Sequence, residues 1–157
     1  MTSTSASTKT DKTPFDHAMQ LASGLAVSSA LYTATKLGIP DLLAQGSCPV
    51  SELATATGTN EDALYRVLRA LTNVGVFTET AGRSFALTPI SEALRSNVAG
   101  GAKELVLWLG NRFHFHLWAE LPYSVKTGKP AVEHIYGKPV LRLWRPSPRW
   151  RMISTWE

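Results

Sequence analysis

Apolar residues recur at helical spacing near the start of the chain. The pattern opens at Pro14, which suits a first helical turn, and ends at Gly38. One side of this stretch is built mainly from small residues, which let the backbone of another helix approach closely. The spacing therefore predicts one long helix with a face for helix–helix packing. That face and its flank include Met19, Ala22, Leu25, Ala26, Ser29 and Tyr32.

Two more helices are predicted between residues 49 and 75. The first covers residues 49–54 and is broken at Gly58. Thr59 and Asp62 stand three residues apart in a capping-box pattern, so Thr59 is expected to cap the second helix. The apolar side of that helix comprises Leu64, Val67, Leu68, Leu71 and Val74.

Two short strands follow these helices directly. Residues 76–79 and 84–87 flank a glycine-containing turn at residues 80–83, which is typical of a β-hairpin. Helix, turn, helix and hairpin in this order make a winged helix-turn-helix. A short helix is then expected from Ile90 to Leu94.

The last apolar pattern predicts a long helical stretch from Ala102 to about Val125. A loop is expected at residues 126–130, and one more helical turn at residues 131–136. The predicted fold class is therefore mainly α. It is a winged helix-turn-helix with a small β-hairpin of two or three strands, flanked by long helices.

Composition sets further limits. The chain has 157 residues and is 44% hydrophobic, which fits one folded domain or a small domain with an appendage. It has no apolar run long enough to cross a membrane and no secretion signal at its start, so no membrane partner is expected. The single cysteine, Cys48, cannot form an internal disulfide, and a reducing, cytoplasmic location is expected.

The net charge of +4 raises the question of nucleic-acid binding. Residues 141–157 account for +3 of it, whereas residues 1–140 carry 12 basic and 11 acidic side chains. In winged helices that read DNA, the second helix enters the major groove with its N-terminal residues. Glu61 and Asp62 stand at that end and would face phosphates, and the turn between the strands offers only Arg83. No nucleic-acid partner is therefore predicted, and a small DNA-binding transcription regulator remains the alternative.

Candidate catalytic chemistry is sparse. The chain has no Gly-x-Ser-x-Gly nucleophile motif and no Gly-x-Gly-x-x-Gly dinucleotide motif. His114 and His116 stand two positions apart, whereas a metal-binding pair on one helix needs a spacing of three or four. Catalytic, cofactor-binding and metal-binding residues are accordingly predicted to be absent.

Several short segments carry a family resemblance. They are Gly24-Leu25-Ala26, Leu37-Gly38-Ile39-Pro40-Asp41-Leu42-Leu43, Val50-Ser51-Glu52-Leu53-Ala54, Leu64-Tyr65-Arg66-Val67-Leu68-Arg69-Ala70-Leu71, Gly75-Val76-Phe77, Leu87-Thr88-Pro89 and Tyr136-Gly137. In this order and spacing they resemble the N-terminal dimerisation domain of the caffeic-acid-type O-methyltransferases. Bacterial relatives of that family include the hydroxyneurosporene methyltransferases. The resemblance covers about residues 15 to 140.

The resemblance implies that this winged helix does not bind DNA. In that family the winged helix entwines with a second copy and closes one side of a substrate pocket. S-adenosylmethionine is bound, and the methyl group transferred, by a following Rossmann-like domain that has no counterpart in this sequence. The chain is therefore expected to form a homodimer through its N-terminal helices. Alone it should bind no cofactor and be inactive, with a small hydroxylated substrate bound only when a catalytic domain is present. The resemblance points to Asn111, Phe113, His114 and Trp118 as a substrate wall.

Residues 141–157 depart from the family pattern, with three tryptophans and four arginines but no helical or strand period. Residues 150–156 can be encoded so that a shifted frame reads Ala-Asp-Asp-Phe-Asn-Val, which is similar to the family's continuation. The hypothesis is a frameshift, natural or introduced in sequencing. A basic, aromatic tail for membrane or nucleic-acid contact is the alternative. Coding DNA without a glycine-rich methyltransferase continuation in the shifted frame would exclude the frameshift.

The predicted organisation has four parts. They are a disordered leader at residues 1–13, a winged-helix dimerisation domain at 14–100, a helical connector at 101–140 and an out-of-frame tail at 141–157. The predicted function is the dimerisation and substrate-lid region of an S-adenosylmethionine-dependent O-methyltransferase, truncated before its catalytic domain. A third alternative is a vestigial chain that folds poorly, because an entwined dimer lacking its catalytic half exposes apolar helix faces.

Overall fold

The computed structural model describes residues 13–138, so the proposed tail at 141–157 and nearly all of the leader lie outside the described residues. Packing divides the chain after Gly110 into two units, which are considered separately. No helix within the described residues is long and apolar enough to span a membrane.

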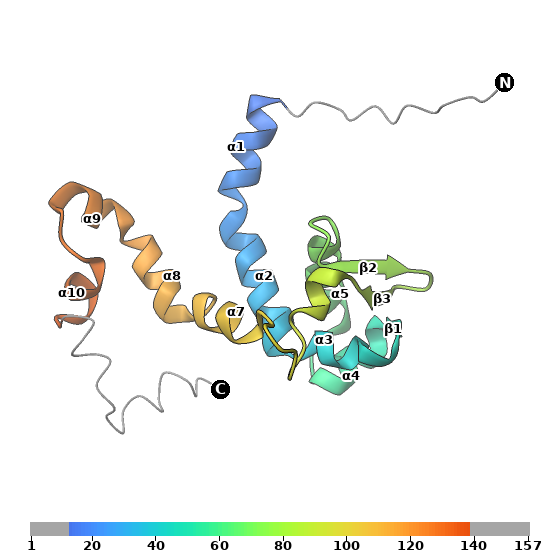
Figure 1. Cartoon of the computed structure of the whole chain (residues 1–157). Helices are drawn as coiled ribbons and strands as arrows, with labels where there is room; N and C mark the ends of the chain where they lie inside the picture. The colour runs from blue at the N-terminus through green and yellow to red at the C-terminus, as the bar shows by residue number, and fades with distance from the viewer. Residues whose placement is uncertain (1–12, 139–157) are drawn as a thin grey trace. The chain divides into compact units, whose positions relative to one another are not determined.

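The N-terminal apolar stretch forms two helices, so the prediction of one continuous helix is wrong. They are α1 (Pro14–Ala22) and α2 (Gly24–Lys36), and they follow one another in nearly the same direction (Figure 1). Thr13 caps α1, because its hydroxyl accepts the Asp16 N–H at 3.2 Å while the Asp16 carboxylate accepts the Thr13 N–H at 2.9 Å. The break falls at Ser23, whose hydroxyl donates to the Gln20 carbonyl at 2.9 Å, next to Gly24.

A short connection leads from α2 into the helix–turn–helix. Gly38 takes a left-handed conformation (φ 73°), and the chain continues through α3 (Ile39–Leu42) and η1 (Leu43–Gln45). It then forms β1 (Cys48–Pro49) and α4 (Val50–Thr57), which ends at a second left-handed glycine, Gly58. The predicted break at Gly58 is thus confirmed.

Helix α5 (Glu61–Thr72) begins one residue later than predicted. Its cap is Asn60, whose side-chain oxygen accepts the Ala63 N–H at 3.0 Å. The expected cap, Thr59, instead lies with its hydroxyl 2.9 Å from that of Thr57. Val74, expected on the apolar side of this helix, lies beyond its end and is exposed.

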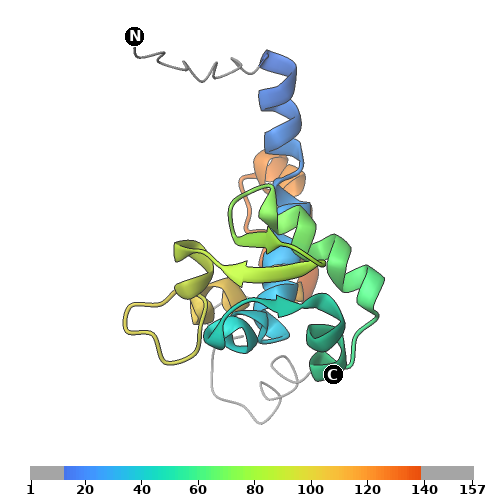
Figure 2. The same ribbon diagram turned by 90° about the vertical axis from the view of Figure 1, so that its right-hand side faces the viewer.

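The sheet has three antiparallel strands in the order β1-β3-β2. Strands β2 (Phe77–Thr80) and β3 (Ser84–Leu87) form the predicted hairpin, with Phe77 opposite Leu87 and Thr80 opposite Ser84 (Figure 2). Strand β1 pairs with β3, and Cys48 lies opposite Phe85. Because β1 has only two residues, no alternating pattern in the sequence could predict it. Helices α2, α4 and α5 and the sheet together enclose the core, and with the hairpin they give the predicted winged helix.

Two further helices complete the first unit. They are α6 (Pro89–Glu92), capped by Thr88, and α7 (Lys103–Leu109). Ser96 and Lys103 both bind Asp41 of α3: the Ser96 N–H donates to Oδ1 at 2.7 Å, and the Lys103 ammonium to Oδ2 at 3.0 Å. These bonds attach α7 to the winged helix, beyond the domain end expected at residue 100.

The second unit contains α8 (Arg112–Ala119), α9 (Leu121–Thr127) and α10 (Ala131–Tyr136). The stretch predicted to be helical from residue 102 to about 125 is helical, and it is divided into α7, α8 and α9. Gly110 and the cap Asn111 separate α7 from α8, and Pro122 lies in the first turn of α9. The further helical turn expected at residues 131–136 is confirmed.

Candidate dimerisation and substrate-facing surfaces

Helix α1 presents apolar side chains that its own chain leaves uncovered. None of its nine residues is buried, and Met19 and Ala22 are both exposed. On the adjoining first turn of α2, Leu25 is 61% exposed and Ala26 is also exposed. These four predicted interface residues thus form one accessible surface along α1 and the start of α2.

Two large apolar residues extend this surface beyond the predicted set. Phe15 and Leu21 are even more exposed than Leu25. Phe15 precedes Met19 by four residues, so helical spacing alone could have placed it on the same side. We call the exposed apolar surface of Phe15, Met19, Leu21, Ala22, Leu25 and Ala26 the α1 face.

The other two predicted interface residues make contacts within the chain. Ser29 is half-buried, and its hydroxyl donates to the Leu25 carbonyl at 2.8 Å. Tyr32 is also half-buried and lies directly against Gly110, where a Cβ would approach the Tyr32 Cβ to 2.5 Å. The Lys36 ammonium lies 5.7 Å from the Tyr32 ring centroid. Tyr32 therefore also holds α2 against the end of α7.

The hairpin turn offers little to a nucleic acid. Arg83 donates to the Asp62 carboxylate at 2.9 Å and lies 3.5 Å from that of Glu61. Its guanidinium also covers the Tyr65 ring at 4.2 Å, and the Tyr65 hydroxyl donates to Glu79 at 2.8 Å. The hydrogen bond to Asp62 is the main reason that the pKa of Arg83 is raised. The cation available for phosphates at this turn is thus neutralised by the acids at the start of α5.

The substrate-wall candidates all lie on or next to α8. Asn111 caps this helix, and its side-chain oxygen accepts the His114 N–H at 3.2 Å and lies 3.2 Å from His114 Nδ1. The two residues are therefore brought together, with the imidazole oriented by the cap. Trp118, one turn further along the same helix, is exposed.

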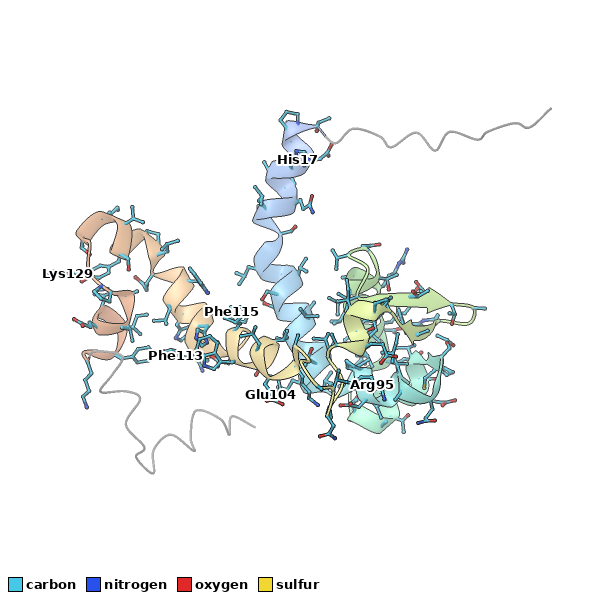
Figure 3. All side chains as sticks on the ribbon, in the orientation of Figure 1. His17, Arg95, Glu104, Phe113, Phe115 and Lys129 are labelled. Carbon is cyan, nitrogen blue, oxygen red and sulfur yellow. The ribbon has the colours of Figure 1, made fainter. Side chains whose placement is uncertain are left out.

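Phe113 belongs to an aromatic cluster that the sequence analysis did not identify. Its ring stacks on that of Tyr136 at 5.4 Å and meets His114 edge-on at 5.3 Å. The rings of Tyr123 and His134 also stack, at 3.9 Å. Figure 3 labels Phe113 and Phe115 on α8. Phe113 lies on α8 and Tyr136 on α10, with α9 between them in the sequence, so the periodicity of a single helix could not have paired them.

Metal-binding and nucleophilic groups show no assembled site. Within residues 13–138, no three histidine, cysteine or acidic side chains cluster as metal ligands would. Burial raises the pKa of the Cys48 thiol, and the negative charge of Glu52 raises it further. The thiol therefore stays protonated near neutral pH.

A family model matches half of the chain. The model describes the O-methyltransferase dimerisation domain, and the match covers residues 19–97. The chain belongs to this family. The match includes most of the α1 face and the whole winged helix, and it supports methyltransferase membership over a DNA-binding regulator.

Individual relatives agree with this assignment. The chain is 38% identical over 119 residues to phenazine O-methyltransferase PhzM of Lysobacter antibioticus, covering 76% of this chain and 35% of that protein. It is 33% identical over 131 residues to 3-amino-4-hydroxybenzoate 4-O-methyltransferase of Streptomyces cremeus, covering 83% and 36%. The chain thus spans about a third of the length of the curated relatives it matches.

Solved structures show the same fold. The crystal structure of LaPhzM superposes with a TM-score of 0.80 at 33% identity, over 90% of this chain and 43% of that one. The N,N-8-amino-8-demethyl-D-riboflavin dimethyltransferase RosA from Streptomyces davawensis gives a TM-score of 0.78 at 29% identity, over 91% and 42%. The dimerisation domain is therefore found in S-adenosylmethionine-dependent methyltransferases whose names specify both oxygen and nitrogen acceptors.

Proposed function

We propose that this chain joins two copies of an S-adenosylmethionine-dependent methyltransferase through α1 and the start of α2, and forms part of the substrate lid. The observation that carries the proposal is the α1 face, an exposed apolar surface in a domain whose family is defined by dimerisation. A second copy related by a twofold axis would cover the same surface on both partners.

The length of α1 supports a need for a partner. Isolated helices shorter than about 12 residues are marginal in water, since few hydrogen bonds offset the cost of helix nucleation. Helix α1 has nine residues, and none of them is buried in its own chain. Docking on a second copy would stabilise α1 and remove its apolar side chains from water.

Sedimentation of the full chain across a concentration series tests this role. A reversible dimer is expected, and Leu25→Gln should weaken it by about tenfold because an amide would be buried in an apolar contact. Thr55→Ala, a variant at an exposed position of α4, is the control and should leave association unchanged. A monomer at every concentration would contradict the proposal.

The lid role rests on polar and aromatic groups along α8. Asn111 and His114 supply adjacent polar groups, Phe113 adds an aromatic surface, and Trp118 is an exposed indole. Such a combination suits a small, planar, hydroxylated acceptor, in which rings pack on rings and polar groups set orientation. The relatives named for phenazine and hydroxybenzoate substrates act on acceptors of this kind.

This role is testable in a fusion of the chain to the methyl-transfer domain of a relative. His114→Ala should raise KM for the acceptor several-fold while changing kcat little, since it removes a contact to bound substrate only. His17→Ala, on α1, is the matched control. Unchanged kinetics for the His114→Ala, Phe113→Ala and Trp118→Ala variants would reject the substrate wall.

We further propose that residues 1–157 alone bind no S-adenosylmethionine. The sequence lacks a glycine-rich nucleotide turn, and it corresponds to about a third of its relatives' length. Calorimetric titration of the chain with S-adenosylmethionine should release no binding heat. Micromolar affinity would refute this assignment.

A further inference from the structure

We propose that Asn111 is a positioning residue, which keeps the neutral imidazole of His114 in the form that carries its hydrogen on Nδ1, the Nδ1–H form. The other ring nitrogen, Nε2, then presents a lone pair and accepts a hydrogen bond from a hydroxyl or amino group of the methyl acceptor. This inference rests on the proposed substrate lid and adds the chemistry that the acceptor must bring to it. Both residues belong to the second unit of the chain.

The side-chain amide of Asn111 has a fixed orientation. As the cap of α8, its oxygen accepts the backbone N–H of His114 at 3.2 Å. If the amide were turned over, its NH2 group would face that N–H, and two donors would oppose each other. The helix cap therefore determines that the oxygen, and not the nitrogen, lies toward His114.

The same oxygen determines where the imidazole carries its hydrogen. It lies 3.2 Å from Nδ1 of His114, within hydrogen-bond distance. An amide oxygen can only accept, so the favoured neutral form of the ring has its hydrogen on Nδ1. A neutral imidazole carries only one ring N–H, and Nε2 is then an acceptor. One amide oxygen thus caps the helix and selects the form of the ring.

Aromatic contacts support the imidazole from another side. The Phe113 ring meets it edge-on, with an angle of 89° between the planes, and Phe113 is itself stacked on Tyr136 of α10. His114 is only half-buried, and Nε2 is the ring nitrogen farther from the backbone. The ring is therefore held at Nδ1 and by its aromatic neighbour, with Nε2 at the end away from the backbone.

An acceptor nitrogen in the substrate wall selects ligands by their hydrogen-bond chemistry. A phenolic hydroxyl or an aromatic amine can donate to Nε2. A methoxy group in the same place has no hydrogen to donate and would set an oxygen lone pair against that of the nitrogen. Sites that hydrogen-bond a substrate hydroxyl discriminate against analogues that lack it. The chemical class is therefore a planar acceptor with a hydroxyl or amino hydrogen, rather than its fully methylated analogue.

Heteronuclear NMR of the histidine ring nitrogens in the full chain tests this assignment, because protonated and unprotonated nitrogens have widely separated shifts. At about pH 9, where histidines are ordinarily neutral, His114 should show the Nδ1–H form. The exposed His17 on α1 is the internal reference and should show the commoner Nε2–H form.

Two variants at position 111 separate the cap from its effect on the ring. Asn111→Ser keeps a good cap, but its hydroxyl can donate as well as accept, so the Nδ1–H fraction of His114 should fall. Asn111→Asp keeps an oxygen that only accepts and should retain the Nδ1–H form. The control is Asn60→Ser, the same change at the cap of α5, where the oxygen accepts the Ala63 N–H. It should leave the His114 signals unchanged.

Kinetics of a fusion test the contact with substrate. The full chain is joined to the methyl-transfer domain of the Streptomyces cremeus relative and assayed with the acceptor in that protein's name, 3-amino-4-hydroxybenzoate. Asn111→Ser should raise KM on the order of threefold, in step with the fall of the Nδ1–H fraction, because only that form accepts. Once His114→Ala has removed the imidazole, the serine change should have no further effect on KM.

The outcomes separate this inference from the substrate lid. An Nε2–H form in the wild-type chain, or an unchanged form in Asn111→Ser, would overturn the inference alone. An Nδ1–H form with an unchanged KM in His114→Ala would defeat the lid role and the contact with it. Equal effects of Asn111→Ser with and without His114 would also overturn the inference, since Asn111 would then act on α8 and not through the imidazole. The wild-type spectrum needs no variant, so it decides even if the serine variant loses helical circular dichroism.

Discussion

Helices α1 and α5 are both amphipathic, but only α5 buries its apolar side within the chain. In α5, Leu64, Leu68 and Leu71 all lie in the core. In α1, by contrast, every residue is exposed, including Met19 at the centre of its apolar side. Periodicity therefore identifies the apolar side of a helix but not the molecule that covers it. The contrast makes α5 a determinant of the fold and leaves α1 as the surface that we propose for association.

The largest expected effect comes from the buried helix. Leu68 is fully buried, so Leu68→Ala should leave a cavity and lower the free energy of unfolding by about 2–5 kcal/mol. Urea unfolding followed by circular dichroism measures this loss. Met19→Ala is the counterpart on α1 and should change the unfolding of the monomer by less than about 0.5 kcal/mol. If both variants lost the same free energy of unfolding, α1 would contribute to the stability of the fold as α5 does, and the contrast would be wrong.

A second effect is expected where α2 meets α7. Gly110→Ala would place a Cβ 2.5 Å from the Cβ of Tyr32, and both atoms are attached to backbone, so the helices must separate. Overpacking of this kind costs about 1–3 kcal/mol. The control is Gly24→Ala at the start of α2, where no atom lies within 4 Å of the added methyl group. Thermal unfolding should show a lower Tm for the first variant and an unchanged or higher Tm for the second.

The bonds that fix α7 to the winged helix predict a pH dependence. Burial tends to raise the pKa of Asp41, but the hydrogen bond from the Ser96 N–H and the interaction with Lys103 outweigh it, so the pKa is lowered. The stabilisation is then fully present above the unfolded pKa of about 3.9 and is lost as pH falls through the lower folded value.

Asp41→Asn should remove this component, worth about 1 kcal/mol after allowance for solvent screening of a carboxylate that is about a third exposed. Urea midpoints measured between neutral and acidic pH should therefore converge for wild type and variant at low pH. A gap that persists below the folded pKa would contradict the assignment.

The smallest effect compares the two helix caps. Asn60→Ala removes the side-chain acceptor for the Ala63 N–H and should lower the free energy of unfolding by about 1 kcal/mol. Thr13→Ala removes the corresponding group from α1, which contributes nothing to the core, so global unfolding of the monomer should stay the same. Hydrogen exchange of the first α1 amides should nevertheless accelerate. If the protection of the α1 amides from exchange rises with protein concentration, association stabilises this helix.

The sequence contains enough information to predict the winged helix. Leu64, Leu68 and Leu71 recur at helical spacing and are buried, and Gly58 ends α4 where its left-handed conformation is required. The hairpin follows from the alternation around Gly82 and Arg83, both of which have positive φ angles. Local chemistry and the global fold agree at these positions, which is why simple periodicity was sufficient.

Helix ends and the candidate site were harder to predict. Asn60 and Thr59 are both good caps, and only the geometry of the turn after Gly58 selects Asn60. The division of residues 102–125 is marked by Gly110, Asn111 and Pro122, which the apolar periodicity of this stretch does not reveal. The stacking of Phe113 on Tyr136 is likewise a tertiary contact. The substrate wall and the interface residues remain predictions. The sequence pattern shows that a surface is apolar, but it does not show which molecule covers that surface.

The pairing of Arg83 with two acids has an evolutionary consequence. Glu61 and Asp62 each lie near the guanidinium, so replacing either one leaves the other to hold it. The arginine becomes available to a phosphate only after both carboxylates are lost, and each of them would also repel the backbone of DNA. Loss of either acid alone is therefore expected to leave the guanidinium paired at this turn.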